Sequence, residues 1–393
     1  MRVTLGDPLA LIPGFEQAHR EQTATYPPVS PEEMGWQPVH TVYVPADRFD
    51  AGTVAAWGET ALDLMRRHLS RKDTARFFEM HEQTARAVHE RVTAKLAAEP
   101  VEDLRIDFED GYGGSPAEED GHAVRAAEAV AAMHAGGTLP RRWGLRVKSF
   151  ADGDPARSVR TLDAFLTGVV ERAGHLPPGF VVTFPKVLMR DYLGQFAACL
   201  AALEKGLGLG EGELRFEMQV EAVQTLRFLD AGLAAALGGR LAAAHFGVFD
   251  YTASCSLPPH EQRLDHPACD HARQVMRAAF AGTGVELSDG SLAAAPASDD
   301  RYAVRNLWWR HVSLIRHSLA DGFYQGWDMH PAHLVSRYVA VYHFHLSRYD
   351  EYLGRVRAWE ERRAAEGGTL EEPATIRTVA AALRRADLAL GNA

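Results

Sequence analysis

The residues most suited to chemistry form an acidic run. Asp107, Glu109 and Asp110 follow an apolar stretch at 104–106 that predicts a strand, and Gly111 then lets the chain turn away. Carboxylates this close raise one another's pKa or bind a cation. The run therefore predicts a metal site or an arginine partner. The alternative is a solvated acidic turn, which is the commoner outcome for an isolated run of this kind.

Three other predicted strands also finish in charged residues. They are residues 143–148 with Arg146, residues 215–221 with Glu221, and residues 245–251 with Asp250. The carboxyl ends of parallel strands meet at one edge of a sheet or at one mouth of a barrel. Several charged strand ends therefore favour one shared site over separate solvated turns.

The composition is that of a globular protein that handles small molecules. The 393 residues are 46% hydrophobic and 24% charged, which is enough to bury a large core, and the formal net charge is -10. The negative charge and the lack of a sustained Lys/Arg run argue against nucleic acid or an anionic membrane surface as partners.

The sequence predicts a cytoplasmic protein. The first 16 residues hold no continuous apolar segment and no small-residue cleavage site, and no apolar run reaches membrane-spanning length. Cys199, Cys255 and Cys269 lack C-x-x-C spacing and cannot all pair. We therefore expect buried thiols in a reducing compartment.

Strand and helix patterns alternate from residue 40 onward. Short apolar stretches predict eight strands, at 41–45, 104–109, 143–149, 180–187, 215–221, 241–248, 284–288 and 322–329. Amphipathic segments predict helices at 54–68, 118–134, 156–173, 191–207, 223–237, 271–283 and 302–319. Eight such repeats indicate an α/β fold of the (β/α)8 TIM-barrel type. A doubly wound sheet would more often have a Gly-rich phosphate loop after its first strand, which this sequence lacks.

Three regions are predicted along the chain. Residues 1–39 are a proline-rich N-terminal arm, residues 40–335 are the catalytic barrel, and residues 336–393 are a C-terminal helical extension. An aromatic stripe in the extension is typical of a core or a subunit interface. We expect a homo-oligomer whose C-terminal helices contact a neighbouring barrel. The stripe consists of Tyr338, Tyr342, Tyr349 and Tyr352.

The charged strand ends should face one another at the mouth of such a barrel. They comprise Glu109, Asp110, Arg146, Lys186, Glu221 and Asp250. Oxygen-only ligands select a hard divalent ion, Mg²⁺ or Mn²⁺, held by one or two carboxylates. We predict that Glu221 and Asp250 are the metal ligands.

Seven motifs follow one another in order over about residues 40–335. They are Val42-Tyr43-Val44-Pro45-Ala46-Asp47-Arg48, Asp107-x-Glu109-Asp110, Arg146, Phe184-Pro185-Lys186-Val187, Val220-Glu221-Ala222, Gly247-Val248-Phe249-Asp250-Tyr251 and Gly326-Trp327-Asp328-Met329-His330-Pro331. This order resembles the HpcH/HpaI aldolase and citrate lyase beta-subunit (CitE-like) family of the phosphoenolpyruvate/pyruvate barrel superfamily. The resemblance implies the same barrel and the same metal-ligand strands.

The chain departs from that family pattern in places. Ala222 follows the ligand glutamate, where the family commonly has Thr or Ser, and Gln325-Gly326-Trp327 replaces the usual G-K pair. These departures bear on the substrate rather than on the fold or the metal. Residues 249–254 also resemble the W-D-Y-x-x-S segment of malate synthases, which condense acetyl-CoA with glyoxylate.

The resemblance implies a metal-dependent carbon-carbon lyase or aldolase. Its substrate would be a small 2-oxo or 3-hydroxy acid, or the CoA thioester of one, reacting through an enolate. Arg146 would stabilise the enolate oxygen, and Asp110, or a metal-bound water held by Glu109 and Asp110, would move the proton. Lys186 is expected to be a charge partner rather than a Schiff-base lysine.

Two other functions remain open at this stage. One is phosphoryl transfer or thioester hydrolysis around phosphoenolpyruvate or an enolate on the same fold. The other is a catalytically silent, metabolite-binding subunit of a larger complex. The intact set of charged strand-end residues argues against the silent subunit. Only the lack of a phosphohistidine or nucleotide motif argues against the phosphoryl-transfer alternative.

Overall fold

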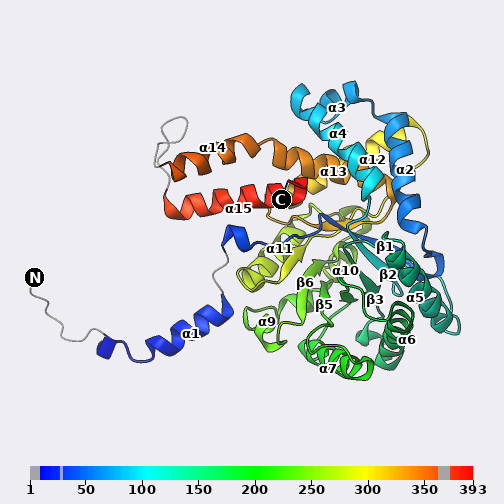
Figure 1. Ribbon diagram of the computed structural model, residues 1–393, viewed down its shortest axis with the longest axis vertical. Coiled ribbons are helices and arrows are strands. Elements are labelled where there is room, and N and C mark those ends of the chain that lie inside the picture. Colours follow the sequence, from blue (N-terminus) through cyan, green and yellow to red (C-terminus); the bar gives the residue numbers. More distant parts are fainter. Residues whose placement is uncertain (1–8, 27–29, 362–371, 393) are drawn as a thin grey trace, which may run out of the picture.

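The computed structural model describes residues 9–26, 30–361 and 372–392. In this part of the chain eight parallel strands pair in the order β7-β6-β5-β4-β3-β2-β1-β8. A parallel bridge between Ser288 and Gln325 brings the two end strands together, so the barrel is nearly closed. The predicted (β/α)8 barrel is confirmed (Figure 1). The strands are β1 (His40–Pro45), β2 (Asp103–Asp107), β3 (Arg142–Arg146), β4 (Val182–Phe184), β5 (Phe216–Val220), β6 (Leu241–Phe246), β7 (Glu286–Ser288) and β8 (Gly326–Asp328).

Helices surround the barrel and extend beyond it (Figure 1). The first group runs from the amino terminus to the fourth strand and contains α1 (Phe15–Thr25), α2 (Thr53–His68), α3 (Arg71–Phe77), α4 (Glu82–Ala98), α5 (Glu119–Ala135) and α6 (Pro155–Ala173). The second group contains α7 (Arg190–Leu207), α8 (Val223–Leu226), α9 (Gly232–Ala236), α10 (Val248–Ser254), α11 (Pro267–Phe280), α12 (Arg301–Ala320), α13 (Pro331–Leu346), α14 (Tyr349–Glu360) and α15 (Pro373–Leu390). No helix of the described residues is both long and apolar enough to span a bilayer.

Helix α6 illustrates how the sequence sets an element. The Asp154 side chain accepts the Arg157 N–H at 3.2 Å, and Pro155 occupies the first turn, where its missing N–H is not needed. Buried residues recur with helical spacing, and Gly174 ends the helix with a left-handed φ of 78°. The buried stripe includes Leu162, Phe165, Leu166 and Val169.

One predicted helix is wrong. Residues 223–237 form the two short helices α8 and α9 instead of a single long one. Asp230 lies at the break, where its side chain pairs with Arg190 and its carbonyl accepts the Leu233 N–H at 3.1 Å. The tertiary ion pair holds Asp230, and the hydrogen bond to its carbonyl starts a new turn where the periodic pattern predicts continuity.

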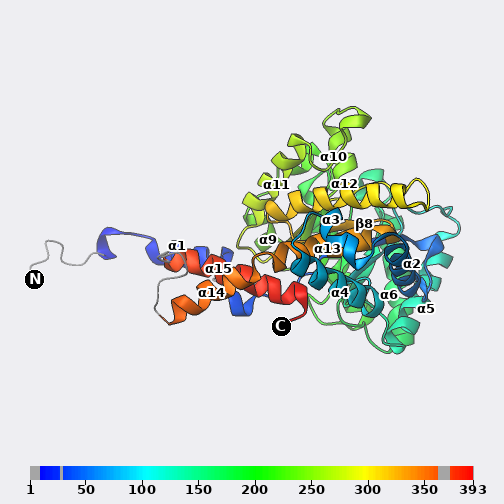
Figure 2. The ribbon, with the colours of Figure 1, turned by 90° about the horizontal axis from the view of Figure 1, so that it is seen from above.

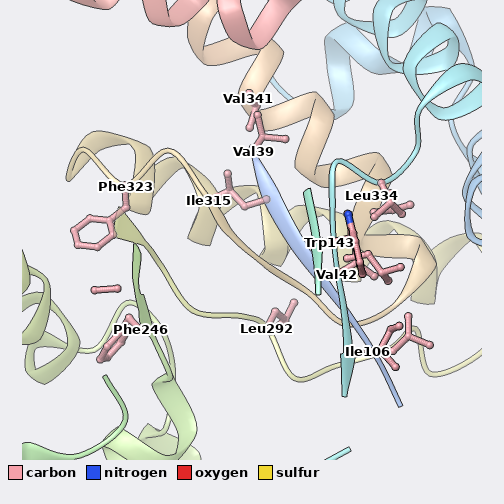
Figure 3. Close-up of a cluster of buried hydrophobic side chains, with 14 of the residues drawn as sticks. Val39, Val42, Ile106, Trp143, Phe246, Leu292, Ile315, Phe323, Leu334 and Val341 are labelled. Atoms are coloured by element: carbon pink, nitrogen blue, oxygen red, sulfur yellow. The ribbon is translucent and has the colours of Figure 1, made fainter. Parts of the chain in front are cut away.

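The apolar core lies between the strands and the helices around them. Figure 3 shows Val42, Ile106 and Trp143 from the strands together with Leu334 and Val341 from α13. All five side chains are buried. Burial of such side chains outside the barrel leaves the alternate strand positions to face its interior.

The interior of the barrel is charged rather than aliphatic. Asp103, Arg105 and Asp107 alternate along β2 and therefore share its inward face. Arg105 is fully buried; its Nη2 donates to Glu217 at 2.7 Å, its Nε donates to Thr183 at 3.0 Å, and its Nη1 binds Asp103. These ion pairs lie one layer of side chains below the carboxyl ends of the strands. Charged residues therefore occupy the barrel interior as well as its mouth.

The C-terminal region divides into a barrel helix and a projecting hairpin. Helix α13 packs against α2, α4 and α12, and its Tyr338 and Tyr342 are buried within this chain. Helices α14 and α15 pack on each other and extend away from the barrel (Figures 1 and 2). The predicted boundary at residue 336 falls inside α13, and the three-region division of the chain stays a prediction.

Candidate active site at the strand ends

Arg146 and Asp107 form the first ion pair of the site. They end β3 and β2 and are register partners in the sheet. Arg146 donates from Nε to Asp107 Oδ1 at 2.7 Å and from Nη2 to Oδ2 at 2.6 Å, a bidentate pair that fixes the guanidinium plane. Burial opposes the charge of Arg146, but Asp107 and Glu109 outweigh it and raise the pKa of the guanidinium.

Glu109 and Asp110 lie beside this pair with pKa values that move in opposite directions. Glu109 is buried, with Oε2 3.2 Å from Arg146 Nη1, and burial raises its pKa. Asp110 is more exposed. Burial opposes its ionisation too, but the hydrogen bond and the charge of Lys186 prevail and lower its pKa. Two adjacent carboxylates with separated pKa values are a pattern of acid–base sites.

Lys186 links most of the acidic groups. Its Nζ donates to Glu109 and, at 2.6 Å, to Asp110, and it lies 3.9 Å from Asp250 Oδ2. Its backbone N–H donates to Glu221 Oε2 at 2.9 Å. The residue has a φ of 48°, in the left-handed region that non-glycine residues seldom occupy. Such strain occurs most often at functional sites.

Glu221 follows β5 and is buried with 4% of its surface exposed. Burial raises its pKa to about 8, and the charges of Glu109 and Asp250 act in the same direction. Gly247 makes room for it, because a Cβ there would lie 2.5 Å from Glu221 Oε1. A buried carboxylate with a strongly raised pKa in a charged cluster is a functional-site candidate.

Asp250 lies in the first turn of α10, directly after β6. Its side chain is about half exposed. Burial raises its pKa, and the nearby Lys186 opposes the shift. The side chain therefore faces the solvent-accessible part of the mouth, while Glu221 lies deeper.

The strand-end residues fit a hard divalent cation. Glu221 and Asp250 offer only oxygen ligands, and the raised pKa of each reflects a site where negative charge is costly without a cation. Asp107 already neutralises the positive charge of Arg146. Lys186 is therefore the main positive charge that faces the remaining carboxylates. A metal ion at the two predicted ligands would balance the cluster.

Among the described residues, two clusters bring three possible metal ligands within reach of one another; neither includes Glu221 or Asp250, and an arginine holds one carboxylate of each. In the buried group of His311, Asp328 and His333, Asp328 accepts from Arg337 at 2.9 Å. In the half-buried group of Asp270, His317 and Asp321, Asp270 accepts from Arg273 at 2.6 Å. A guanidinium already bound to the carboxylate opposes a second cation there.

The structure brings all the predicted site residues to one mouth of the barrel. Arg146, Glu109, Asp110, Lys186 and Asp250 are linked by side-chain ion pairs. Glu221 joins them through the backbone of Lys186. The roles assigned to these six residues stay predictions.

Sequence reasoning missed two residues that position Arg146. The sequence marks Asp107 only as part of the acidic run, although its place on the inward face with Arg105 indicates a partner on a neighbouring strand. Tyr43 has its ring centroid 4.9 Å from the Arg146 guanidinium carbon. The first sequence motif includes Tyr43 but does not mark it as a partner of Arg146, because a buried aromatic residue fits a β1 strand equally well.

Comparison with known proteins places the fold. A family model described as a domain of unknown function (DUF6986) matches residues 15–390. No curated protein matches the sequence. A citrate lyase from Burkholderia xenovorans LB400 superposes with a TM-score of 0.59 at 18% identity, covering 91% of this chain and 95% of that chain.

Two further solved structures share the fold. Haloferax volcanii malate synthase, solved as a lead(II) complex, has a TM-score of 0.52 at 15% identity and covers 89% of this chain and 88% of its own. CitE from Mycobacterium tuberculosis, solved with magnesium, acetoacetate and coenzyme A, has a TM-score of 0.50 at 18% identity and covers 90% and 98%. The predicted resemblance to CitE-like barrels is thus confirmed at the level of the fold.

Proposed function

Because the chain belongs to the DUF6986 family, whose description names no activity, we propose its function from the strand-end site. The protein is a divalent-metal-dependent carbon-carbon lyase or aldolase. It acts through an enolate on a small 2-oxo or 3-hydroxy acid, or on the CoA thioester of one. The observation that best supports this proposal is that three groups lie at one mouth of the barrel: the buried Glu221, the more exposed Asp250 and the fixed guanidinium of Arg146.

Glu221 and Asp250 would hold the metal, Mg²⁺ or Mn²⁺. When bound there, the ion supplies a Lewis acid for the carboxylate and keto oxygens of a 2-oxo acid. The oxygen-only donor pair supports a hard ion over zinc or copper. The backbone N–H of Lys186 fixes one oxygen of Glu221, so the carboxylate is held before metal binds.

Arg146 would stabilise the oxygen on which negative charge develops. Asp107 holds two of its nitrogens, which orients the guanidinium without leaving it free to rotate. Nη1, which is 3.2 Å from Glu109, is the nitrogen that Asp107 leaves available for a substrate oxygen. A buried, pre-oriented donor of this kind gains strength because water is excluded.

Asp110 would accept the proton, with Glu109 beside it. Against the effect of burial, the hydrogen bond and the charge of Lys186 lower the pKa of Asp110, which favours the ionised base. Burial raises the pKa of Glu109, while Arg146 and Lys186 both pair with its carboxylate. The half-exposed side chain of Asp110 places the base where a substrate enters.

The similar structures guide the choice of substrates without assigning one. CitE from Mycobacterium tuberculosis was solved with acetoacetate and coenzyme A, and Haloferax volcanii malate synthase was solved with magnesium and glyoxylate. Small oxo acids and acyl-CoA thioesters therefore form the first panel. We propose free acids and thioesters together, since the strand-end residues alone favour neither.

The test is a cleavage and condensation screen with added Mg²⁺ or Mn²⁺. Release of pyruvate, glyoxylate, oxaloacetate or acetyl-CoA from a panel of hydroxy acids and acyl-CoAs is the expected result. Glu221→Gln and Asp250→Asn should remove both metal binding and turnover, while Asp63→Asn, at an exposed carboxylate of α2, should change neither. Phosphate release would instead support phosphoenolpyruvate-type transfer. Metabolite binding with no turnover would contradict an enzyme.

A further inference from the structure

Helix α1 is a helix without a partner surface in its own chain. None of its residues is buried, and it points away from the barrel (Figures 1 and 2). It has 11 residues, and isolated helices shorter than about 12–15 residues are marginal in water. Packing of an apolar face normally supplies the missing stability.

The apolar face of this arm is exposed. Leu11, Ile12 and Phe15 are 62%, 52% and 48% exposed; Leu11 and Ile12 lie just before the helix, and Phe15 is its first residue. Tyr26, at the base of the arm, lies against Gly282, since a Cβ on that glycine would be 3.3 Å from the tyrosine ring. The arm is therefore anchored at its carboxyl end while its apolar residues face solvent.

The hairpin of α14 and α15 carries a matching groove, which we call the α14–α15 groove. It consists of two adjoining cavities of 320 Å³ and 430 Å³ that share Tyr352 and Ala382. Aromatic and small side chains line it together with arginines. The lining includes Tyr324, Phe344, Tyr352, Ala382, Arg348 and Arg385.

The groove offers one positive charge. The Arg385 guanidinium carbon lies 4.0 Å from the centroid of Tyr324, and no carboxylate of the described residues pairs with it. Arg348, in the same lining, donates to Glu351 at 2.8 Å, so Arg385 carries the charge that is open to a partner. The groove therefore suits an amphipathic segment that also carries acidic residues.

The arm of η1 (Leu9–Leu11) and α1 has that chemistry. Glu16 and Glu21 are exposed acidic residues of α1, and Glu16 directly follows Phe15. Glu16 makes a 3.8 Å pair with the exposed Arg20, a type of contact that contributes little. Exposed apolar residues followed by acidic ones match an aromatic groove in which Arg385 pairs with no carboxylate of the described residues.

The arrangement of the arms points to a second copy of this chain. Helix α1 and the α14–α15 hairpin extend from the same side of the barrel in both views (Figures 1 and 2), yet α1 does not fill its own groove. We propose that α1 of one protomer docks in the α14–α15 groove of another, and that the exchange is reciprocal about a two-fold axis. This contact is independent of the proposed catalytic function.

The first test is the oligomeric state of the full chain over a dilution series, measured by analytical ultracentrifugation. Wild type should form dimers or multiples of dimers at micromolar concentration. The double variant Ile12→Glu/Phe15→Glu should raise the dissociation constant by about 10-fold or more, because it places charge on buried anchors. Val124→Glu, at an exposed apolar site on α5, is the matched control and should not change it.

The second test uses complementation. Arg385→Glu, in the groove, should raise the dissociation constant of the dimer as the double variant in the arm does. A mixture of the two variants contains one intact arm and one intact groove per heterodimer, so heterodimers should form where neither variant dimerises alone. Native mass spectrometry separates the species by mass, and circular dichroism confirms that each variant is folded.

Three results would overturn the proposal. A wild-type chain that stays monomeric at tens of micromolar leaves the groove for another partner. An oligomer unaffected by the arm and groove variants assembles through a different surface. Weakened variants that fail to complement each other in the mixture exclude docking of the arm in the groove.

Discussion

The backbone N–H of Lys186 donates to Glu221 Oε2 at 2.9 Å, while the side chain of the same lysine reaches Glu109 and Asp110. The left-handed φ of 48° lets one residue serve both groups. The backbone holds a predicted metal ligand, and the ammonium occupies the anionic space beside it. Lys186 is therefore a cation tethered next to the site where a divalent ion is expected.

We expect Lys186→Gln to raise the affinity for Mn²⁺. Its Nζ lies 3.9 Å from Asp250, and one charge about 6 Å from a divalent ion costs about 1.4 kcal/mol even at the dielectric constant of water, or about 10-fold in affinity. Titration calorimetry without substrate measures the effect. Lys148→Gln is the control, since the nearby Lys148 donates to the Phe108 carbonyl and contacts no predicted ligand. Unchanged or weaker Mn²⁺ binding in Lys186→Gln would contradict the idea that the lysine ammonium competes with the metal ion for these carboxylates.

Arg146→Lys should fold and bind metal but lose most of its turnover. A lysine cannot form the bidentate pair with Asp107 and still offer a donor to the substrate. Loss of one pre-oriented oxyanion donor reduces turnover by about 100-fold to 1,000-fold. Steady-state kinetics with saturating metal is the measurement, and wild-type-like turnover would remove Arg146 from the proposed role.

Gly247→Ala should displace Glu221 and weaken metal binding. The added Cβ would lie 2.5 Å from Glu221 Oε1, so the carboxylate must move away from the Lys186 amide. Gly194→Ala is the matched control because a Cβ at that helical glycine meets nothing within 4 Å. The control should keep metal affinity and gain about 0.5–1 kcal/mol of stability from the better helix former. Equal metal affinity in the two variants would mean that Glu221 is not a ligand.

Stability should fall as the pH drops below the ordinary histidine range. Burial lowers the pKa of His333 from 6.5 to about 4. Between those values the unfolded chain binds the proton and the folded chain does not, so acid favours unfolding. Each such histidine contributes up to about 1.4 kcal/mol per pH unit.

The measurement is urea unfolding at about pH 7.5 and about pH 5. His333 accepts the Met329 N–H at Nδ1 and faces the Ala294 carbonyl with Nε2 at 2.8 Å, so protonation would place two N–H groups against each other. His333→Gln should show a smaller loss of stability in acid than wild type. His175→Gln, at an exposed residue, should keep the wild-type slope.

The barrel and the set of charged strand ends could be predicted because both depend on local patterns. Apolar stretches that end in charge mark the carboxyl ends of parallel strands, which brought Glu221 and Asp250 to one mouth. The bidentate contact between Asp107 and Arg146 could not be predicted, because it depends on register between two strands. The break at Asp230 was also hidden, since its ion pair with Arg190 is a tertiary contact.

The charged interior has a consequence for how the mouth can be altered. Burial raises the pKa of Tyr43, and charges from two layers also act on it: Glu217 and Arg105 from the layer below, and Arg146 from the strand ends. The two layers therefore share one electrostatic environment. Water does not screen charges there, because these side chains are buried. Substitutions deep in the barrel should therefore change the charge environment at the mouth. Laboratory evolution of the proposed activity should yield beneficial substitutions in the barrel interior as well as in the loops.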